Sequence, residues 1–151
     1  MGQKKVCLAC SAGGHLTELL QLEQAWKGKQ HYFVSDRRLN ALDLAKREKV
    51  HFVKCPRRNP LLLALNIAQS LLVFFGERPD IVISTGADTA IPTCIIAKLF
   101  GKKVVFIESF CRIREASLSG KIMYRFADLF LVQWEQNKEF FPKAVYAGSV
   151  F

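Results

Sequence analysis

The sequence lacks a hydrophobic run long enough to cross a membrane as a helix. Its longest apolar stretch, Leu61 to Phe75, would form a helix of about 22 Å, whereas the hydrocarbon core of a bilayer is roughly 30 Å thick. The residues before the first glycine pair, MGQKKVCLACSA, contain only a brief apolar stretch, which is not typical of a secretory signal. We therefore expect neither a transmembrane helix nor a signal peptide.

The cysteines lack the even number and the spacing of a disulfide framework. There are five, which indicates reduced thiols in a cytosolic setting. Cys7 and Cys10 form a CxxC inside a predicted strand, where positions three apart point to opposite faces of the sheet. That placement disfavours shared metal ligation and a redox pair, so we expect two small buried side chains and no metal site.

Acidic residues are few relative to basic ones. Lys and Arg together number 22, against 13 for Asp and Glu. This excess favours an anionic partner, such as nucleic acid, an acidic membrane surface or a phosphate-bearing substrate, and charge alone does not rank the three. The sequence also lacks a groove-reading or base-stacking motif, so we expect no nucleic-acid partner.

The chain shows neither an internal repeat nor low complexity, and its 151 residues are the usual size of one domain. Strand patterns and helix patterns alternate along it. Strands are predicted at Lys5 to Ala9, His31 to Val34, Val50 to Val53, Ile81 to Ser84, Val104 to Ile107 and Leu129 to Val132. Helices are predicted at His15 to Trp26, Leu39 to Lys46, Leu61 to Phe75, Ala90 to Phe100 and Ser119 to Phe126. This order predicts an α/β fold, a parallel sheet with helices on both faces and ligands at the carboxyl ends of the strands.

Three residues indicate where helices begin and end. Asn59, followed by Pro60, is a good helix start, because asparagine caps free backbone donors and proline suits the first turn. Gly76 and Gly101 are predicted to end the helices that precede them.

The stretch SAGGHLTELLQL places two glycines and a histidine where a strand becomes a helix. Gly13 and Gly14 allow a ligand to approach the backbone, and the free N–H groups that begin the helix favour a phosphate or diphosphate. His15 is either a general base or a hydrogen-bond donor to a phosphate, or it is a helix-start residue bonded to nearby backbone.

A dinucleotide site is the competing interpretation of this region. Asp36 follows the second strand at the distance expected of a ribose-binding acid. The glycines, however, do not have the GxGxxG spacing that such a site needs. Arg37 and Arg38 suit a phosphate there, or simply form a solvated loop end.

The segment KCPRRNP and the helix after it carry an excess of apolar surface. Asn66, Gln69 and Ser70 form only a narrow polar stripe, whereas a helix on a sheet normally shows water a broad polar face. Basic residues directly before this helix make the arrangement typical of a basic rim around an apolar patch in a membrane interface. The membrane-facing residues are then Lys54, Arg57, Arg58, Leu61, Leu62 and Leu65. A helix held between the sheet and a partner protein explains the same surface equally well.

Two more strand ends carry polar residues. In STGADTAIP, Gly86 allows close backbone approach, and Thr85 and Thr89 bond a sugar or phosphate or cap the helix, with capping the default for Thr89. In FIESFCRIRE, Glu108 ends an apolar strand. It is either a crevice residue or one half of an ion pair with an arginine, Arg112 or Arg114.

Taken in order, GGHLTELLQL, STGADTAIP, FIESFCRI, ADLFLVQWE and PKAVYAGSVF resemble the asparagine-linked glycosylation protein fourteen family and its bacterial capsule and exopolysaccharide counterparts. The resemblance covers nearly the whole chain. Members of this family are the acceptor-side half of a split GT-B glycosyltransferase. The chain is similar, more distantly, to the amino-terminal domain of MurG, a lipid-linked N-acetylglucosaminyltransferase of peptidoglycan assembly.

The resemblance implies a single Rossmann-like acceptor-binding domain over residues 1–151, the N-terminal half of a GT-B fold. It implies that His15 is the base for the acceptor hydroxyl and that Glu108 is an acidic catalytic position at the crevice. The diphosphate of a polyprenyl-linked acceptor would be bound by Gly13, Gly14, Thr85 and Gly86. No cofactor is implied. Asp88 departs from the family pattern, because it adds a charge to a loop expected to be small and apolar.

The resemblance also implies a partner. The sequence ends where the carboxyl-terminal, nucleotide-sugar domain of a GT-B enzyme would begin, so we expect a small donor-binding subunit with the UDP-sugar site to complete a heterodimer. Alone, the chain would be inactive or nearly so. Because the membrane anchor of eukaryotic members has no counterpart here, we expect peripheral attachment at the cytoplasmic face of an anionic membrane. The alternative is a non-catalytic scaffold or activator that recruits a complete glycosyltransferase.

Overall fold

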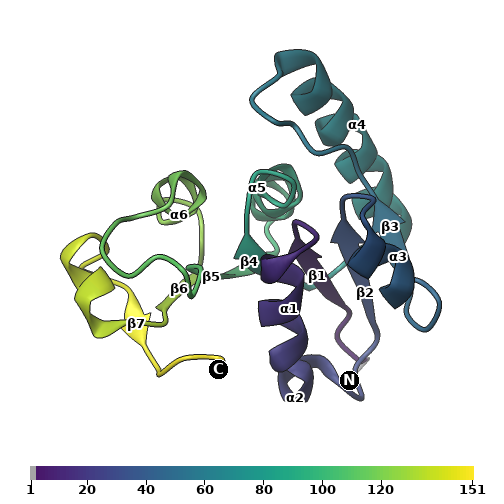
Figure 1. Ribbon diagram of the computed structural model, residues 1–151. Coiled ribbons are helices and arrows are strands. Elements are labelled where there is room, and N and C mark those ends of the chain that lie inside the picture. Colours follow the sequence, from purple (N-terminus) through teal and green to yellow (C-terminus); the bar gives the residue numbers. More distant parts are fainter. Residues whose placement is uncertain (1–2) are drawn as a thin grey trace.

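A seven-stranded sheet forms the centre of the computed structural model, which describes residues 3–151 (Figure 1). All neighbouring strands are parallel, in the order β3-β2-β1-β4-β5-β6-β7. The strands are β1 (Val6–Cys10), β2 (His31–Ser35), β3 (Val50–Phe52), β4 (Ile81–Gly86), β5 (Lys103–Ile107), β6 (Leu129–Val132) and β7 (Val145–Tyr146). The six predicted strands are confirmed, and β7 is an additional short edge strand.

Helices connect the strands as predicted, with one division. They are α1 (Gly14–Gln21), α2 (Glu23–Trp26), α3 (Leu39–Leu44), α4 (Pro60–Glu77), α5 (Ile91–Leu99), α6 (Leu118–Met123) and the 3-10 helix η1 (Glu135–Glu139). The single helix predicted from His15 to Trp26 is divided at Leu22, whose N–H bonds to the carbonyl of Leu19, three residues back.

Strand β1 illustrates how the sheet separates two cores. Val6, Leu8 and Cys10 pack on one face with side chains of α1, α2 and α3. Cys7 and Ala9 pack on the other face with side chains of α4 and α5. The alternation of a strand therefore places the two CxxC thiols in different cores, as predicted, and burial raises the pKa of both.

The ends of α4 and α5 follow the sequence in part. Asn59 caps α4, because its side chain accepts hydrogen bonds from the N–H groups of Leu61 (2.9 Å) and Leu62 (3.3 Å). Gly101, with φ of 71°, follows the last turn of α5 as predicted. Gly76 does not end α4. The helix continues to Glu77 and ends at Arg78, which adopts the left-handed conformation at φ of 50°.

Helix α4 turns its polar stripe inward. The amide of the wholly buried Asn66 donates to the carbonyls of Lys54 (2.6 Å) and Thr89 (3.1 Å). The hydroxyl of Ser70 donates to Asn66 Oδ1 and lies 3.1 Å from Thr93 Oγ1 on α5. The polar stripe therefore joins α4 to the loop before it and to α5. The outward surface is apolar, with exposed fractions of 79% for Leu61, 42% for Leu65, 76% for Leu72 and 53% for Phe75.

At 18 residues, α4 is longer than predicted and extends for about 27 Å. Among the described residues it is the one helix whose length and hydropathy would allow it to cross a bilayer, and 22% of it is buried against the rest of the fold. Figure 1 shows its amino-terminal half standing beyond the carboxyl ends of the strands.

Glu77 ties the far end of α4 to the sheet. Its carboxylate, 8% exposed, lies 2.5 Å from Lys5 Nζ, 2.5 Å from Lys49 Nζ and 2.7 Å from His51 Nε2. Burial raises the pKa of this carboxyl, but the hydrogen bonds from Lys49, Lys5 and His51 outweigh it and hold the pKa at about 2. The Glu77 carboxylate thus joins the end of α4 to the start of β1, through Lys5, and to the start of β3, through Lys49 and His51.

Replacing this carboxylate is expected to destabilise the fold in a pH-dependent way. Glu77→Gln should lower the free energy of unfolding by about 1–3 kcal/mol near neutral pH. Because the pKa in the folded state lies below the ordinary 4.5, this contribution is present above pH 4.5 and is lost as the pH falls toward 2. Urea unfolding at several pH values measures it. Glu23→Gln, which breaks an exposed ion pair with Lys27, is the control and should change stability by less than about 0.5 kcal/mol. Equal losses in both variants would contradict the role of Glu77.

Candidate functional site

The strand order reverses between β1 and β4, and a cavity opens beside this reversal. It has a volume of about 430 Å³ and lies at the carboxyl ends of β4 and β5. In an open α/β sheet this is the usual place for a ligand. Its apolar wall consists of Leu63, Ile91, Phe106, Leu118 and Ile122. Its polar wall includes His15, Arg58, Thr85, Glu108 and Arg112.

His15 reaches the cavity from the start of α1. Its main-chain carbonyl accepts a hydrogen bond from Thr85 Oγ1 at 2.7 Å, which joins α1 to the end of β4. Its ring packs over Gly86, where an added Cβ would lie 3.6 Å from His15 Cε1. Nδ1 is buried and has no hydrogen-bond partner among residues 3–151. Burial lowers the pKa of His15, and the positive charge of Arg112 acts in the same direction. The imidazole is therefore neutral at neutral pH, the state a general base requires.

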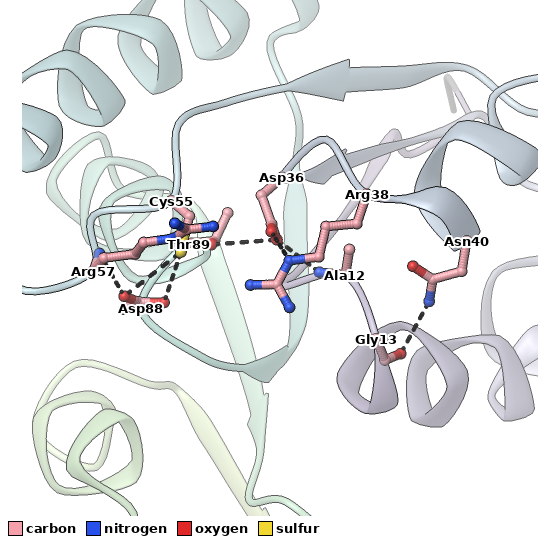
Figure 2. Close-up of polar contacts among 9 residues, drawn as sticks. All are labelled: Ala12, Gly13, Asp36, Arg38, Asn40, Cys55, Arg57, Asp88 and Thr89. Atoms are coloured by element: carbon pink, nitrogen blue, oxygen red, sulfur yellow. Dashed lines mark hydrogen bonds and ion pairs between the residues drawn. The ribbon is translucent and has the colours of Figure 1, made fainter.

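The glycine turn lies beside the cavity and does not line it. The N–H of Ala12 donates to Asp36 Oδ1 at 2.7 Å, and the carbonyl of Gly13 accepts from Asn40 Nδ2 at 3.2 Å (Figure 2). The loop after β2 and the start of α3 thus hold the turn in place. Arg38 Nε contacts the other oxygen of Asp36 at 2.7 Å, so both oxygens of this acid already have partners other than a ribose.

Glu108 lies in the cavity wall with 1% of its surface exposed. One carboxylate oxygen accepts from the N–H of Ser109 and the other from Ser117 Oγ, both at 3.0 Å. Ser117 in turn caps α6. Among residues 3–151, Glu108 forms no ion pair with an arginine, and Arg112 pairs with Glu115 instead, so the ion-pair interpretation is wrong. Burial raises the pKa of Glu108. Through Ser117, the Glu108 carboxylate also anchors the start of α6 beside the cavity.

Sequence reasoning missed Glu18, a second buried carboxylate. Its Oε1 accepts from Ser109 Oγ (3.1 Å) and from the N–H of Phe110 (3.0 Å), so α1 holds the loop that follows β5. Burial raises the pKa of Glu18 also. One signal in the sequence could have indicated it. Glu18 directly precedes Leu19 on the side of the predicted helix that faces the sheet, where water would not solvate a carboxylate.

The predicted membrane-facing residues separate into three groups. Arg58 lines the cavity that contains His15. Lys54, Arg57 and Leu62 line a second cavity of about 290 Å³, which does not adjoin His15. Leu61 and Leu65 lie on the exposed face of α4. The two adjacent arginines line different cavities, and both adopt left-handed backbone, with φ of 47° for Arg57 and 59° for Arg58.

The structure gives Asp88 and Thr89 roles that the sequence did not indicate. Asp88 Oδ2 accepts the N–H of Arg57 at 3.0 Å, so its charge holds the loop before α4 (Figure 2). Thr89 does not cap α5, because its hydroxyl lies 3.5 Å from Asp36 Oδ1 and the cap position is Ala90.

Comparison with known proteins adds two findings. The family model described as "Oligosaccharide biosynthesis protein Alg14 like" matches residues 6–150. The human protein named UDP-N-acetylglucosamine transferase subunit ALG14 (Homo sapiens) is 32% identical over 177 residues, which cover 96% of this chain and 82% of that protein.

Solved structures share the fold. UDP-N-acetylglucosamine 2-epimerase from Rickettsia bellii superimposes with a TM-score of 0.79 at 16% identity, over 99% of this chain and 46% of that one. MurG from Acinetobacter baumannii superimposes with a TM-score of 0.78 at 17% identity, over 97% of this chain and 45% of that one. The predicted Rossmann-like fold is therefore confirmed. The chain spans less than half the length of either structure.

Gly120, inside α6, tests whether Glu108 fills the space against that helix. Alanine normally stabilises a helix interior over glycine by about 0.5–1 kcal/mol. Here an added Cβ would overlap the Glu108 carboxylate, so Gly120→Ala should lower the free energy of unfolding by about 1–3 kcal/mol. Gly76→Ala is the matched control, because a Cβ at that position in α4 meets nothing within 4 Å. Denaturant unfolding of both variants measures the difference, and a gain in stability for both would refute the tight packing.

Proposed function

Because this chain belongs to the family of Alg14-like oligosaccharide biosynthesis proteins, we propose that it is the membrane-associated subunit of a two-component glycosyltransferase. It binds a polyprenyl-diphosphate-linked acceptor, and a separate subunit holds the UDP-sugar across the crevice. The word "subunit" in the relative's name supports a partner of this kind. The described chain, residues 3–151, acts as a single acceptor-binding domain in this proposal.

The observation that carries the proposal is a polar catalytic wall and an apolar helix meeting in one cavity. His15 is neutral and lies in the wall, and Leu63 of α4 lines the same cavity. From Leu63 the exposed apolar face of α4 leads away from the crevice. An acceptor with a sugar at one end and an isoprenoid chain at the other matches this change from polar to apolar surface.

The chemical step requires one proton acceptor. The oxygen of an acceptor hydroxyl attacks the anomeric carbon of the UDP-sugar, and the bond from that carbon to the UDP oxygen breaks. UDP leaves with the electron pair of that bond, and the hydroxyl proton passes to a ring nitrogen of His15. Thr85 positions His15 through its 2.7 Å hydrogen bond, and Glu108 holds the loop and helix that form the opposite wall.

The acceptor diphosphate has cationic and backbone donors available. Arg58 and Arg112 line the cavity, and guanidinium groups bind phosphate in a bidentate manner. Gly13 and Gly14 remain proposed diphosphate contacts, because they precede and begin α1, whose first N–H groups have no intrahelical acceptor. Gly86 keeps the cavity beside His15 open, since it has no side chain and a φ of 97°.

The exposed apolar face of α4 supports peripheral membrane attachment at the cytoplasmic side. Transferring a leucine or phenylalanine side chain out of water contributes about 1.5–3 kcal/mol, so a few such residues hold a small protein at an interface. The exposed residues are Leu61, Leu65, Leu72 and Phe75. The basic residues before the helix face anionic headgroups in this arrangement.

A two-component assay tests the proposal. The chain is purified alone and with a co-expressed donor-binding partner, and UDP-N-acetylglucosamine and other labelled UDP-sugars are supplied with a polyprenyl-diphosphate acceptor. We expect transfer with the pair and little or none with either component alone. If the partner alone turns over soluble acceptors at the full rate, the scaffold alternative holds. The absence of transfer in every combination would contradict the proposal.

Replacing His15 should change both the turnover rate of the complex and the dependence of that rate on pH. His15→Ala should reduce kcat of the complex by about 10²–10⁴-fold without preventing complex formation. Because burial lowers its pKa, the neutral base persists below pH 6.5, so the acidic limb of the rate profile should lie below that value and vanish in the variant. Gln21→Ala, exposed on the same helix, is the control. Full activity of the His15→Ala variant would contradict the role of His15 as a base and would indicate a structural role instead.

A further inference from the structure

A second cavity lies apart from the acceptor crevice, at the carboxyl ends of β2 and β3. It has a volume of about 290 Å³, and its walls come from the loops that follow these two strands and from the first turn of α4. Four cations line it together with one acid, and the cations are Arg37, Arg38, Lys54 and Arg57. The acid is Asp36. The sequence places these cations in two groups about sixteen residues apart, and only the fold brings the groups together.

Two of the four cations are oriented by side-chain contacts. Arg37 lies over the Phe52 ring, with its guanidinium carbon 6.0 Å from the ring centre. Arg38 is oriented by its 2.7 Å contact with Asp36. Figure 2 shows the guanidinium groups of Arg38 and Arg57 pointing toward one another. The side chains of Arg37 and Arg38 are therefore held in place at the cavity wall.

The loop that carries Lys54 and Arg57 is fastened along its backbone. The N–H of Lys54 donates to Gln69 Oε1 at 2.7 Å, and its carbonyl accepts from the buried Asn66. The N–H of Arg57 donates to Asp88 at 3.0 Å. Loop positions that are fixed before binding lose less conformational entropy when a ligand arrives.

The cavity has more cations than its one acid neutralises. Among residues 3–151, no carboxylate forms an ion pair with the side chains of Arg37, Lys54 or Arg57. The single acid, Asp36, already has Ala12 and Arg38 as partners. Convergent arginines and a lysine without counter-ions match a phosphate group, which accepts several charge-assisted hydrogen bonds.

We propose that this cavity binds a phosphate group, separately from the acceptor diphosphate. Leu62 lines the cavity, and the neighbouring Leu61 begins the exposed apolar face of α4. The phosphate of an anionic lipid headgroup seated here would hold α4 in its orientation at the membrane surface. A soluble phosphate compound has the same recognition chemistry, and the experiment separates the two sources. The proposal deepens the proposed function, on which it rests, because it gives the basic residues before α4 a defined phosphate site in place of a general contact with anionic headgroups.

The test uses the full chain and two variants with equal loss of charge. Arg37→Gln/Lys54→Gln removes two cavity cations, whereas Arg125→Gln/Lys138→Gln removes two exposed cations outside the cavity. One arm titrates inorganic phosphate at constant ionic strength and follows binding by calorimetry. The other measures partition onto phosphatidylcholine vesicles with and without phosphatidic acid. Thermal unfolding confirms that both variants remain folded.

We expect saturable phosphate binding by the wild type and the control, weakened by about tenfold or more in the cavity variant. Partition onto phosphatidic acid vesicles should fall about tenfold in the cavity variant and less than about threefold in the control. Loss of phosphate binding with unchanged vesicle partition would support the site and identify a soluble ligand. Equal losses in the two variants, or no saturable phosphate binding, would overturn the proposal. Because the acceptor crevice is separate, failure here leaves the transfer assay unaffected.

Discussion

The buried amide of Asn66 is the contact on which the functional surface most depends. It joins α4 to the loop before it and to the segment before α5, through the carbonyls of Lys54 and Thr89. Turning α4 about its axis would leave these polar groups unpaired, at a cost of about 1–3 kcal/mol for each group. The polar stripe is therefore satisfied inside the protein, and the leucines of α4 face outward. As a result of the same orientation, Leu63 lines the cavity that contains His15 and Leu62 lines the cationic cavity.

Two buried carboxylates complete the crevice from the other side. Glu18 and Glu108 both bond to the turn at Ser109, from α1 and from the end of β5. Burial disfavours their charged forms, yet backbone and hydroxyl donors surround each of them. They connect α1, which carries His15, to α6, which forms the far wall. Supporting contacts of this kind would hold His15 within the narrow geometry that its proposed role as a general base requires.

The sequence predicted much of the site, although it did not predict how its residues are grouped. His15, Thr85, Gly86 and Glu108 were expected at strand ends, and the structure brings all four to one cavity. Their placement followed from strand order, because the carboxyl ends of parallel strands share one edge. The separation of Arg57 from Arg58 was not predictable, since it depends on two left-handed residues in a loop with no glycine. The roles of Glu18 and Asp36 also depend on partners 92 and 24 residues away.

By itself, the sequence determined the alternation of strands and helices, the parallel sheet and the Asn59 cap, because hydrophobic period and capping act over a few neighbouring residues. The prediction that Gly76 ends α4 was wrong, so the helix is longer than predicted, and the sequence did not indicate the two-residue strand β7. Only the tertiary structure decided which way the polar stripe of α4 faces. A narrow stripe of asparagine and serine is satisfied equally by water or by buried carbonyls and hydroxyls. The choice depends on whether α5 and the loop after β3 supply those partners, which is a property of the assembled fold.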